Sequence, residues 1–288
     1  MSSQLQKKTY ITVKDHSVSQ ESFELLYNGA FEMLETFPQP SKDRLPDYYK
    51  SDDYISHTDS KRNVFEKVYH LVKGIALKRK IRLINSVSKN TKSLLDVGCG
   101  TGDFLQVALE SGWAITGIEP NEQARAIANQ KTNQSVFDSE QLFNLKPQSF
   151  DVITLWHVLE HLPELEAHFS LFNKLLKPNG VLIIAVPNFK SYDAQLYKEF
   201  WAAYDVPRHL WHFSQESIKR LANGVEMKLI KTTPMKFDAF YVSLLSEKYK
   251  FGRMNYFKGF WNGCRSNWKA ARTSEYSSLI YVLKQQNT

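Results

Sequence analysis

The 288-residue sequence predicts an α/β protein with a doubly wound, mostly parallel sheet. Between residues 93 and 187, short apolar runs of strand length alternate with segments that have the length and periodicity of helices. The apolar run at 181–186 is typical of a strand buried on both faces. A glycine-rich segment at 98–102 joins the first strand directly to a helix. Together these features indicate a sheet covered by helices on both faces.

Each expected element has a local reason. Strands are predicted where apolar residues cluster, at 93–99, 114–120, 134–139, 150–156, 181–187, 227–233 and 278–284. Helices are predicted between them, at 103–111, 121–131, 164–176 and 214–223. Pro178 and Gly180 end the third helix, because neither residue favours its continuation. Ser214 caps the fourth helix, since its hydroxyl accepts a hydrogen bond from a free backbone N–H.

Three segments lie outside this alternation. Residues 1–92 are predicted to be an N-terminal extension and helical cap, with helix from Lys61 to Ser88 and extended chain in the proline-rich stretch 37–46. The α/β domain then occupies 93–288. Within it, 189–213 and 236–272 are longer than ordinary connections and are expected as insertions on the ligand side of the sheet.

Composition limits the class of protein. No apolar run approaches the ~20 residues of a membrane-spanning helix, and residues 1–8 lack the apolar core of a signal peptide. Only two cysteines occur, Cys99 and Cys264, so neither a disulfide framework nor a four-cysteine zinc site can form. We therefore expect a soluble, cytoplasmic protein.

The glycine turn predicts a ligand site. Gly98, Gly100 and Gly102 follow the first strand with Cys99 among them, and glycines there allow a ligand to lie against the backbone. Their spacing is G-x-G-x-G, and Asp103 stands where the dinucleotide fingerprint has its third glycine. A carboxylate at that helix N-terminus repels a pyrophosphate, which disfavours NAD.

Acidic residues at the strand ends indicate which ligand fits instead. Glu119, followed by Pro120, ends the second strand and can accept hydrogen bonds from both ribose hydroxyls. Asp138 ends the third strand and can accept one from an exocyclic amine of adenine, whereas Asp96 can meet an ammonium group. Ligands of open α/β sheets bind at this edge. An adenosine joined to an amino acid satisfies the set, which describes S-adenosylmethionine.

Several motifs resemble those of class I S-adenosylmethionine-dependent methyltransferases. The similarity rests on Leu-Leu-Asp-Val-Gly-Cys-Gly-Thr-Gly at 94–102, Gly-Ile-Glu-Pro at 117–120, the fourth-strand segment 150–162, and 175–184. Residues 205–213, Asp-Val-Pro-Arg-His-Leu-Trp-His-Phe, resemble the subgroup related to the small-molecule methyltransferases of quinone biosynthesis. These motifs cover about half of the chain.

The resemblance implies a Rossmann-like, seven-stranded sheet of order 3-2-1-4-5-7-6, with the seventh strand antiparallel and helical cap additions. It implies S-adenosyl-L-methionine as cofactor and S-adenosyl-L-homocysteine as product. It also places Trp156 and His157 beside the methionine portion of the cofactor.

Histidines gather on the expected acceptor side. His157 or His209 could take a proton from an acceptor before methyl transfer, because histidine titrates near neutral pH. The alternative is that both are hydrogen-bonded scaffolding. The run 157–161 also has the H-x-x-E-H form of one zinc-peptidase class, but that site needs a helix and a third ligand, so no metal is expected.

The insertion 236–272 combines ten aromatic residues with eight Lys or Arg. It suits a lid over the acceptor, a peripheral contact with anionic lipid, a stacking surface for single-stranded RNA, or simple packing of a helical cap. The preferred function is a methyltransferase for a small-molecule or lipid-linked acceptor. The alternatives are an RNA or protein methyltransferase, and a binding module without turnover. The first is supported by two basic segments, because residues 1–92 contain 16 Lys or Arg against 11 Asp or Glu and residues 236–272 contain eight against two. Nothing in the sequence sets the oligomeric state.

Overall fold

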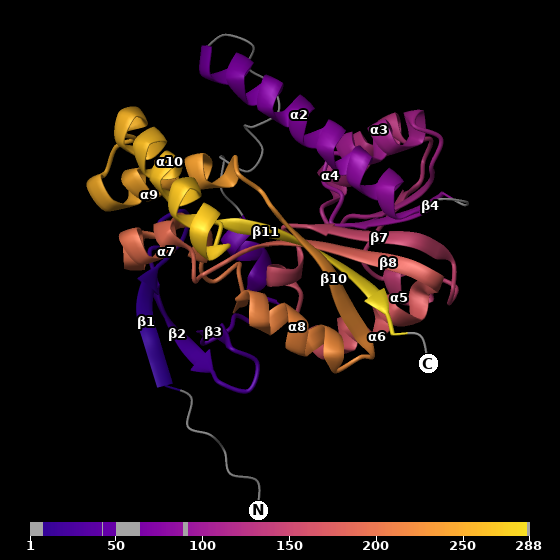
Figure 1. The fold of residues 1–288 in the computed structure, drawn as a ribbon, viewed down its shortest axis with the longest axis horizontal. Coiled ribbons are helices and arrows are strands. Elements are labelled where there is room, and N and C mark those ends of the chain that lie inside the picture. The colour runs from indigo at the N-terminus through magenta and orange to yellow at the C-terminus, as the bar shows by residue number, and fades with distance from the viewer. Residues whose placement is uncertain (1–7, 42, 50–63, 89–91, 287–288) are drawn as a thin grey trace, which may run out of the picture.

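A seven-stranded sheet forms the centre of the computed structural model, which describes residues 8–41, 43–49, 64–88 and 92–286 (Figure 1). Its strands are β4 (Ser93–Val97), β5 (Ala114–Ile118), β6 (Val136–Phe137), β7 (Phe150–Trp156), β8 (Leu176–Pro187), β10 (Met227–Pro234) and β11 (Ser278–Gln285). The order β10-β11-β8-β7-β4-β5-β6 is the predicted 3-2-1-4-5-7-6. Strand β11 runs antiparallel to both neighbours, which confirms the predicted fold class.

Helices cover both faces of this sheet (Figure 1). On one side lie α2 (Val64–Val87), α3 (Asp103–Glu110) and α4 (Glu122–Lys131). On the other lie α5 (Gln141–Asn144), α6 (Leu165–Leu175) and α8 (Gln215–Asn223). Each layer has its own core: Phe104 and Leu105 pack on the first face, and Phe169, Phe172 and Ile218 on the second. Burial of apolar surface on both faces explains why the strands are apolar throughout.

Two helices of the central domain have capped N-termini, of which the sequence predicted the one at Ser214. Asn121 accepts a hydrogen bond from the N–H of Ala124 at the start of α4. Ser214 accepts one from the N–H of Ser217, whose hydroxyl in turn accepts from the N–H of Ser214. One boundary differs, because residues 177–180, expected as a turn, are part of β8 and form an irregularity in its pairing with β7.

The N-terminal segment corrects the predicted helical cap. Residues 8–37 form an antiparallel sheet of β1 (Lys8–Lys14), β2 (Ser22–Asn28) and β3 (Met33–Phe37), to which β9 (Trp211–His212) adds a fourth strand. In β2, Phe23 and Leu25 alternate with exposed residues and face a second core that includes Trp201 and Tyr204. Among the described residues of this segment, α2 keeps the predicted helical character and a short 3-10 helix, η1, spans Leu45–Tyr49. Residues 61–63 at the predicted helix start lie outside the described residues.

The two insertions meet beside the N-terminal sheet (Figure 1). The first contains α7 (Tyr192–Tyr197) and the short turns η3 (Lys198–Phe200) and η4 (Ala202–Tyr204). The second is the helical pair α9 (Asp238–Phe251) and α10 (Tyr256–Thr273). Buried Asp193 ties them together, because it accepts hydrogen bonds from Trp201, Ser266 and Ser277. None of the helices in the described ranges is both long and apolar enough to cross a bilayer.

Candidate functional site

The glycine turn lies at the C-terminal edge of the sheet, where β4 passes into α3. Gly98 has φ +69°, and a Cβ there would come within 2.4 Å of Val158. Gly100 has φ +56°, but a Cβ there would meet nothing within 4 Å. Gly102, with φ +78°, is the residue before α3. The space above Gly100 is therefore open, and the glycine backbone borders it directly.

A cavity of about 250 Å³ lies over this turn. It is lined by β4 and the turn on one side and by helix α2 on the other. Its lining residues are Lys73, Ala76, Leu77, Lys80, Asp96, Gly98, Cys99, Gly100, Asp103, Phe104 and Trp156. The sequence analysis predicted five of them as cofactor contacts, Asp96, Gly98, Cys99, Gly100 and Trp156. Helix α2 thus forms the wall of the cavity opposite the glycine turn. No sequence motif predicted this contribution of α2.

Two opposite charges face each other across the cavity. Asp96 is 2% exposed and accepts a 2.6 Å hydrogen bond from Thr154, its register partner in β7. Burial raises the pKa of Asp96 to about 7, although the Thr154 hydrogen bond and the charge of Lys80 oppose this shift. Burial lowers the pKa of Lys80 to about 8, against the attraction of Asp96 and Asp238. Lys73 and Asp103 form their own ion pair at 2.6 Å, so apart from that pair the cavity offers one anionic and one cationic side chain.

Aromatic rings hold the lysine in place. The Nζ atom of Lys80 lies 4.3 Å from the ring centroid of Trp156 and 5.7 Å from that of Phe104. A cation over an aromatic face is attracted by the ring quadrupole. The indole nitrogen of Trp156 is buried and has no hydrogen-bond partner among the described residues. A buried donor of this kind favours a ligand that brings an acceptor.

Glu119 faces the glycine turn from the end of β5. Its two carboxylate oxygens accept hydrogen bonds from the backbone N–H groups of Gly100, at 2.8 Å, and Asn121, at 3.0 Å. Burial raises the pKa of Glu119, and these two hydrogen bonds limit the shift. Each oxygen can accept a further hydrogen bond. Glu119 and the adjoining Pro120 do not themselves line the cavity.

The remaining predicted cofactor residues have different surroundings. Asp138 is exposed and accepts hydrogen bonds from the N–H groups of Glu140 and Gln141, at the start of α5. Its observed partners are therefore those of a turn, and its contact with adenine stays a prediction. Burial raises the pKa of the Cys99 thiol, so this cysteine is not a thiolate at neutral pH.

His157 is enclosed by carboxylates at the end of β7. Its Nε2 lies 3.0 Å from Asp238 at the start of α9, and its Nδ1 lies 3.4 Å from Glu160. Burial by itself lowers the pKa of His157, but the hydrogen bonds and charges of Asp238 and Glu160 outweigh it and raise the pKa to about 10. A protonated imidazole has no lone pair with which to accept a proton. This geometry favours a positioning role over that of a general base.

His209 lies deeper and has another environment. Its Nδ1 donates to the carbonyl oxygen of Ala203, and burial followed by the nearby His161 lowers its pKa well below the usual value. Ligand atoms of Glu160, His161 and His209 lie within 4.8 Å of one another. The two histidines of the H-x-x-E-H run therefore have different partners. The Nε2 atom of His157 contacts Asp238, whereas a ring nitrogen of His161 lies near one of His209. Catalytic roles for His157 and His209 stay predictions.

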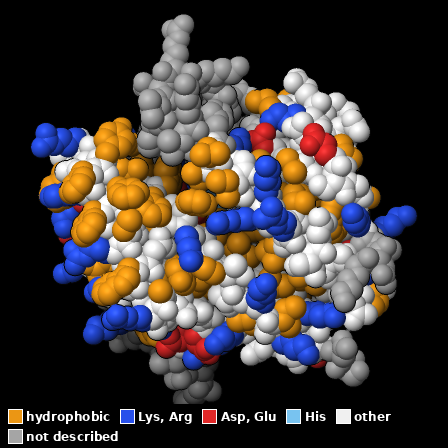
Figure 2. Space-filling model, turned by 45° about the horizontal axis from the view of Figure 1, so that its top comes forward, with side chains coloured by type: hydrophobic (Ala, Val, Ile, Leu, Met, Phe, Trp, Pro, Cys, Tyr) orange, Lys and Arg blue, Asp and Glu red, His pale blue; other side chains and the backbone are white. Residues whose placement is uncertain are grey.

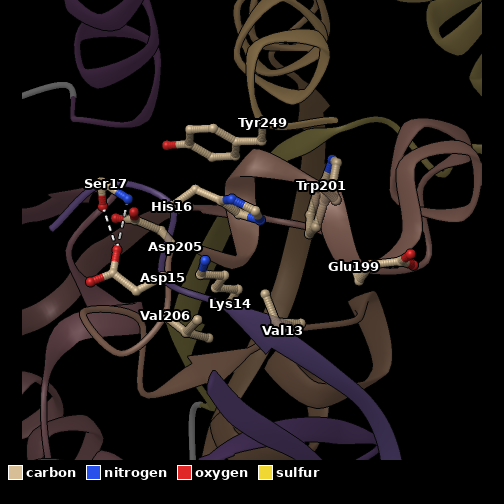
Figure 3. Close-up of a pocket in the computed structure, with 10 residues that line it drawn as sticks. All are labelled: Val13, Lys14, Asp15, His16, Ser17, Glu199, Trp201, Asp205, Val206 and Tyr249. Atoms are coloured by element: carbon tan, nitrogen blue, oxygen red, sulfur yellow. Dashed lines mark hydrogen bonds between the residues drawn. The ribbon is translucent and has the colours of Figure 1, made fainter. Parts of the chain in front are cut away.

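A second cavity, of about 10 Å³, lies between β1 and the two insertions (Figure 3). The ring of Tyr249 stacks on His16 with centroids 4.8 Å apart, and Asp205 lies close by (Figure 3). This volume holds about one water molecule, so the cavity is too small for a methyl acceptor.

Comparison with known proteins identifies related methyltransferases. Residues 60–232 match a family model described as a methyltransferase domain. A ubiquinone biosynthesis O-methyltransferase of Idiomarina loihiensis is 27% identical over 170 residues, which are 54% of this chain and 70% of that protein. The corresponding protein of Vibrio atlanticus is 34% identical over 110 residues, 35% of this chain and 46% of that protein.

Solved structures share the fold. The magnesium protoporphyrin IX methyltransferase of Synechocystis with bound S-adenosylhomocysteine has a TM-score of 0.57 and 15% identity, covering 85% of this chain and all of that one. An S-adenosylmethionine-dependent methyltransferase of Archaeoglobus fulgidus has a TM-score of 0.51 and 19% identity, covering 77% of this chain and all of that one.

The sheet order, the glycine turn and the charged cavity define the class I S-adenosylmethionine-dependent methyltransferases. The family model spans more than half of the sequence, so this chain belongs to the methyltransferase domain family. The predicted class of enzyme and its cofactor are thereby confirmed. The match begins at residue 60 and ends at 232, and so includes α2 but neither the N-terminal sheet nor the α9–α10 pair. Matched segments span 45–60% of the length of several other curated relatives.

Proposed function

We propose that this chain transfers the methyl group of S-adenosylmethionine to a small-molecule acceptor, free or lipid-linked. The observation that carries the proposal is the pairing of Asp96 and Lys80 in the cavity beside the glycine turn. The amino-acid end of the cofactor carries one ammonium and one carboxylate group. Because Lys73 and Asp103 are engaged in their own ion pair, Asp96 and Lys80 are the cavity charges that can match those two groups.

The residues around the cavity can each hold one part of this cofactor. Asp96 would hold the ammonium group and Lys80 the carboxylate. Glu119, whose oxygens retain acceptor capacity beside Gly100, would hold the ribose hydroxyls. The open space at Gly100 allows the ligand to contact the backbone. When bound, the cofactor supplies an electrophilic methyl group on a sulfonium.

The chain's own contribution to the transfer is positioning. Trp156 and His157 lie at the end of β7, between the cofactor cavity and the start of α9. The Asp238 contact fixes the ring of His157, and with it the wall on which an acceptor would rest. Holding two reactants in line lowers a barrier by several kcal/mol before any proton transfer. The relatives named as ubiquinone biosynthesis O-methyltransferases support an acceptor of small size.

Calorimetric titration with S-adenosylmethionine and S-adenosylhomocysteine tests the cofactor site. We expect micromolar binding that weakens at least tenfold in Glu119→Ala, a loss of ~1.4 kcal/mol. Glu122→Ala is the matched control, because that residue is exposed one turn away in α4. Absence of binding to either ligand would contradict the proposal.

Turnover is measured separately, as formation of S-adenosylhomocysteine with pools of small aromatic, amine and prenylated acceptors. Acceptor-dependent product supports the proposal. Tight cofactor binding without product from any pool would instead support the binding-module alternative. Product with RNA or protein alone would support the macromolecular alternative.

A further inference from the structure

Helix α10 carries small residues on its buried face and large aromatic residues on its exposed face. Its buried positions are small residues, Gly259, Gly263, Ser266 and Ala270. The packing requires them, because a Cβ at Gly259 would come within 2.8 Å of Leu244 and one at Gly263 within 2.6 Å of Phe240. The large aromatic residues of α10 are therefore left on the opposite, outward face.

Those aromatic residues, with one from the end of α9, form a continuous surface. We call it the aromatic–basic surface; its exposed aromatic members are Phe251, Tyr256, Phe257, Phe260, Trp261 and Trp268. Phe257 is 78% exposed, and all six are more than half exposed. In α10, positions 257, 260, 261 and 268 fall on one helical stripe. Figure 2 shows hydrophobic side chains gathered over this part of the molecule, with Lys and Arg between them.

Within the stretch of chain that forms this surface, the charged residues have a single sign. Residues 248–272 contain seven Lys or Arg and no Asp or Glu. Lys258 lies 5.0 Å from the ring centroid of Phe251, and Arg272 lies 4.7 Å from that of Trp268. The acidic residue nearest to this stretch in sequence, Glu247, is buried at 2% exposure. A partner for this surface must therefore offer both apolar groups, which can cover the aromatic rings, and negative charge.

We propose that the aromatic–basic surface docks on an anionic lipid bilayer. Exposed aromatic side chains on a helix that carries Lys and Arg lie in the boundary between headgroups and acyl chains. A second copy of the chain fits less well, because a symmetric contact would place this positive surface against itself. Single-stranded nucleic acid binds in basic grooves, whereas no residue of α10 lines either of the two cavities described above.

Docking would place the methyl-transfer site close to the membrane. The surface belongs to the same helical pair whose first residue, Asp238, contacts His157. An acceptor dissolved in the bilayer could thus approach the end of β7 from the side of α9. This last step rests on the proposed function; the docking itself does not.

Vesicle flotation tests the docking. We expect the protein to float with phosphatidylcholine vesicles that contain phosphatidylglycerol, and to bind pure phosphatidylcholine at least about tenfold more weakly, with binding that falls as salt rises. The double variant Phe257→Ser with Trp261→Ser should lose about tenfold or more of the affinity. Lys258→Glu with Arg265→Glu should lose the preference for phosphatidylglycerol.

Matched controls lie elsewhere on the molecule. Phe143→Ser changes an aromatic residue in α5 that is 64% exposed, and Lys228→Glu changes an exposed lysine of β10. Both should float like the unchanged protein. Calorimetry with S-adenosylmethionine shows whether each variant is folded, and it separates failure of docking from failure of the cofactor site.

Three results would overturn the inference. The first is absence of flotation at low salt, and the second is equal flotation of the surface variants and the controls. The third is that the surface variants, but not the controls, lose polyuridine binding or lose self-association in sedimentation velocity, while their flotation is unchanged.

Discussion

The ammonium group of Lys80 in α2 lies 4.3 Å from the ring centroid of Trp156 at the end of β7. The contact joins a helix outside the sheet to the edge at which the cofactor binds. It also places a positive charge opposite Asp96, in a cavity that the glycine turn alone would leave neutral on that side.

Substitution Lys80→Met should weaken S-adenosylmethionine binding about tenfold or more, because the cofactor carboxylate then loses its charged partner. Adenosine, which has no carboxylate, should bind the variant and the unchanged protein alike. Calorimetry with both ligands measures this difference. Lys78→Met, an exposed neighbour in α2, is the control. Equal loss of adenosine binding would contradict a specific role for the lysine.

Substitution His157→Gln should destabilise the fold in a pH-dependent manner. The pKa of His157 is raised from 6.5 to about 10, so its contribution is complete below pH 6.5 and is lost as the pH rises toward 10. The difference in unfolding free energy between the two proteins should therefore shrink between pH 6 and pH 10. Urea unfolding at several pH values measures it. A difference that grows with pH would show that the imidazole is neutral.

Substitution Asp193→Asn should lower the unfolding free energy by about 2 kcal/mol or more. The carboxylate is fully buried and accepts from Trp201, Ser266 and Ser277, so an amide would turn a donor toward donors. Thermal and urea unfolding measure the loss. Glu166→Gln, an exposed change in α6, should have little effect. An Asp193→Asn protein as stable as the unchanged protein would show that the packing of the two insertions does not depend on this carboxylate.

Removal of divalent metal should leave methyl transfer unchanged. Glu160 is buried beside protonated His157, which balances its charge without an ion, and transfer to a positioned acceptor needs no Lewis acid. The rate after dialysis against a chelator measures this. A rate that is lost, is restored by a divalent ion, and is absent in His209→Gln would instead assign a metal to the cluster of Glu160, His161 and His209.

Local patterns were sufficient for the central sheet. The apolar runs, the cap at Ser214 and the glycine turn are short-range features, and each forms where the sequence predicts it. The position of Asp96 followed from the same logic, because residues at the carboxyl ends of neighbouring parallel strands meet at one edge. The position of Trp156 was predicted through the family resemblance.

The alternation of Phe23 and Leu25 in β2 was present in the sequence and was not interpreted as a strand, whereas the attachment of β9 was missed for a physical reason. Strand β9 has only two residues, and it pairs with β3 across more than 170 positions of sequence, as in the register of Leu34 with His212. A pair so short carries no periodicity that a sequence can display. Its stability comes from burial against Trp201 and Tyr204, in an insertion whose position is set by the complete fold.

The sequence by itself determined the positions of the central strands, the glycine turn and the chemistry of the cofactor, because these depend on local backbone preference and on the shared edge of a parallel sheet. The strand order was predicted through the family resemblance of the motifs. Only the tertiary structure decided that Lys80 faces Asp96, that His157 is held between Asp238 and Glu160, and that the aromatic residues of α10 face outward. Each of these depends on how distant elements pack, and packing distance rather than sequence spacing sets the charge and exposure of a side chain.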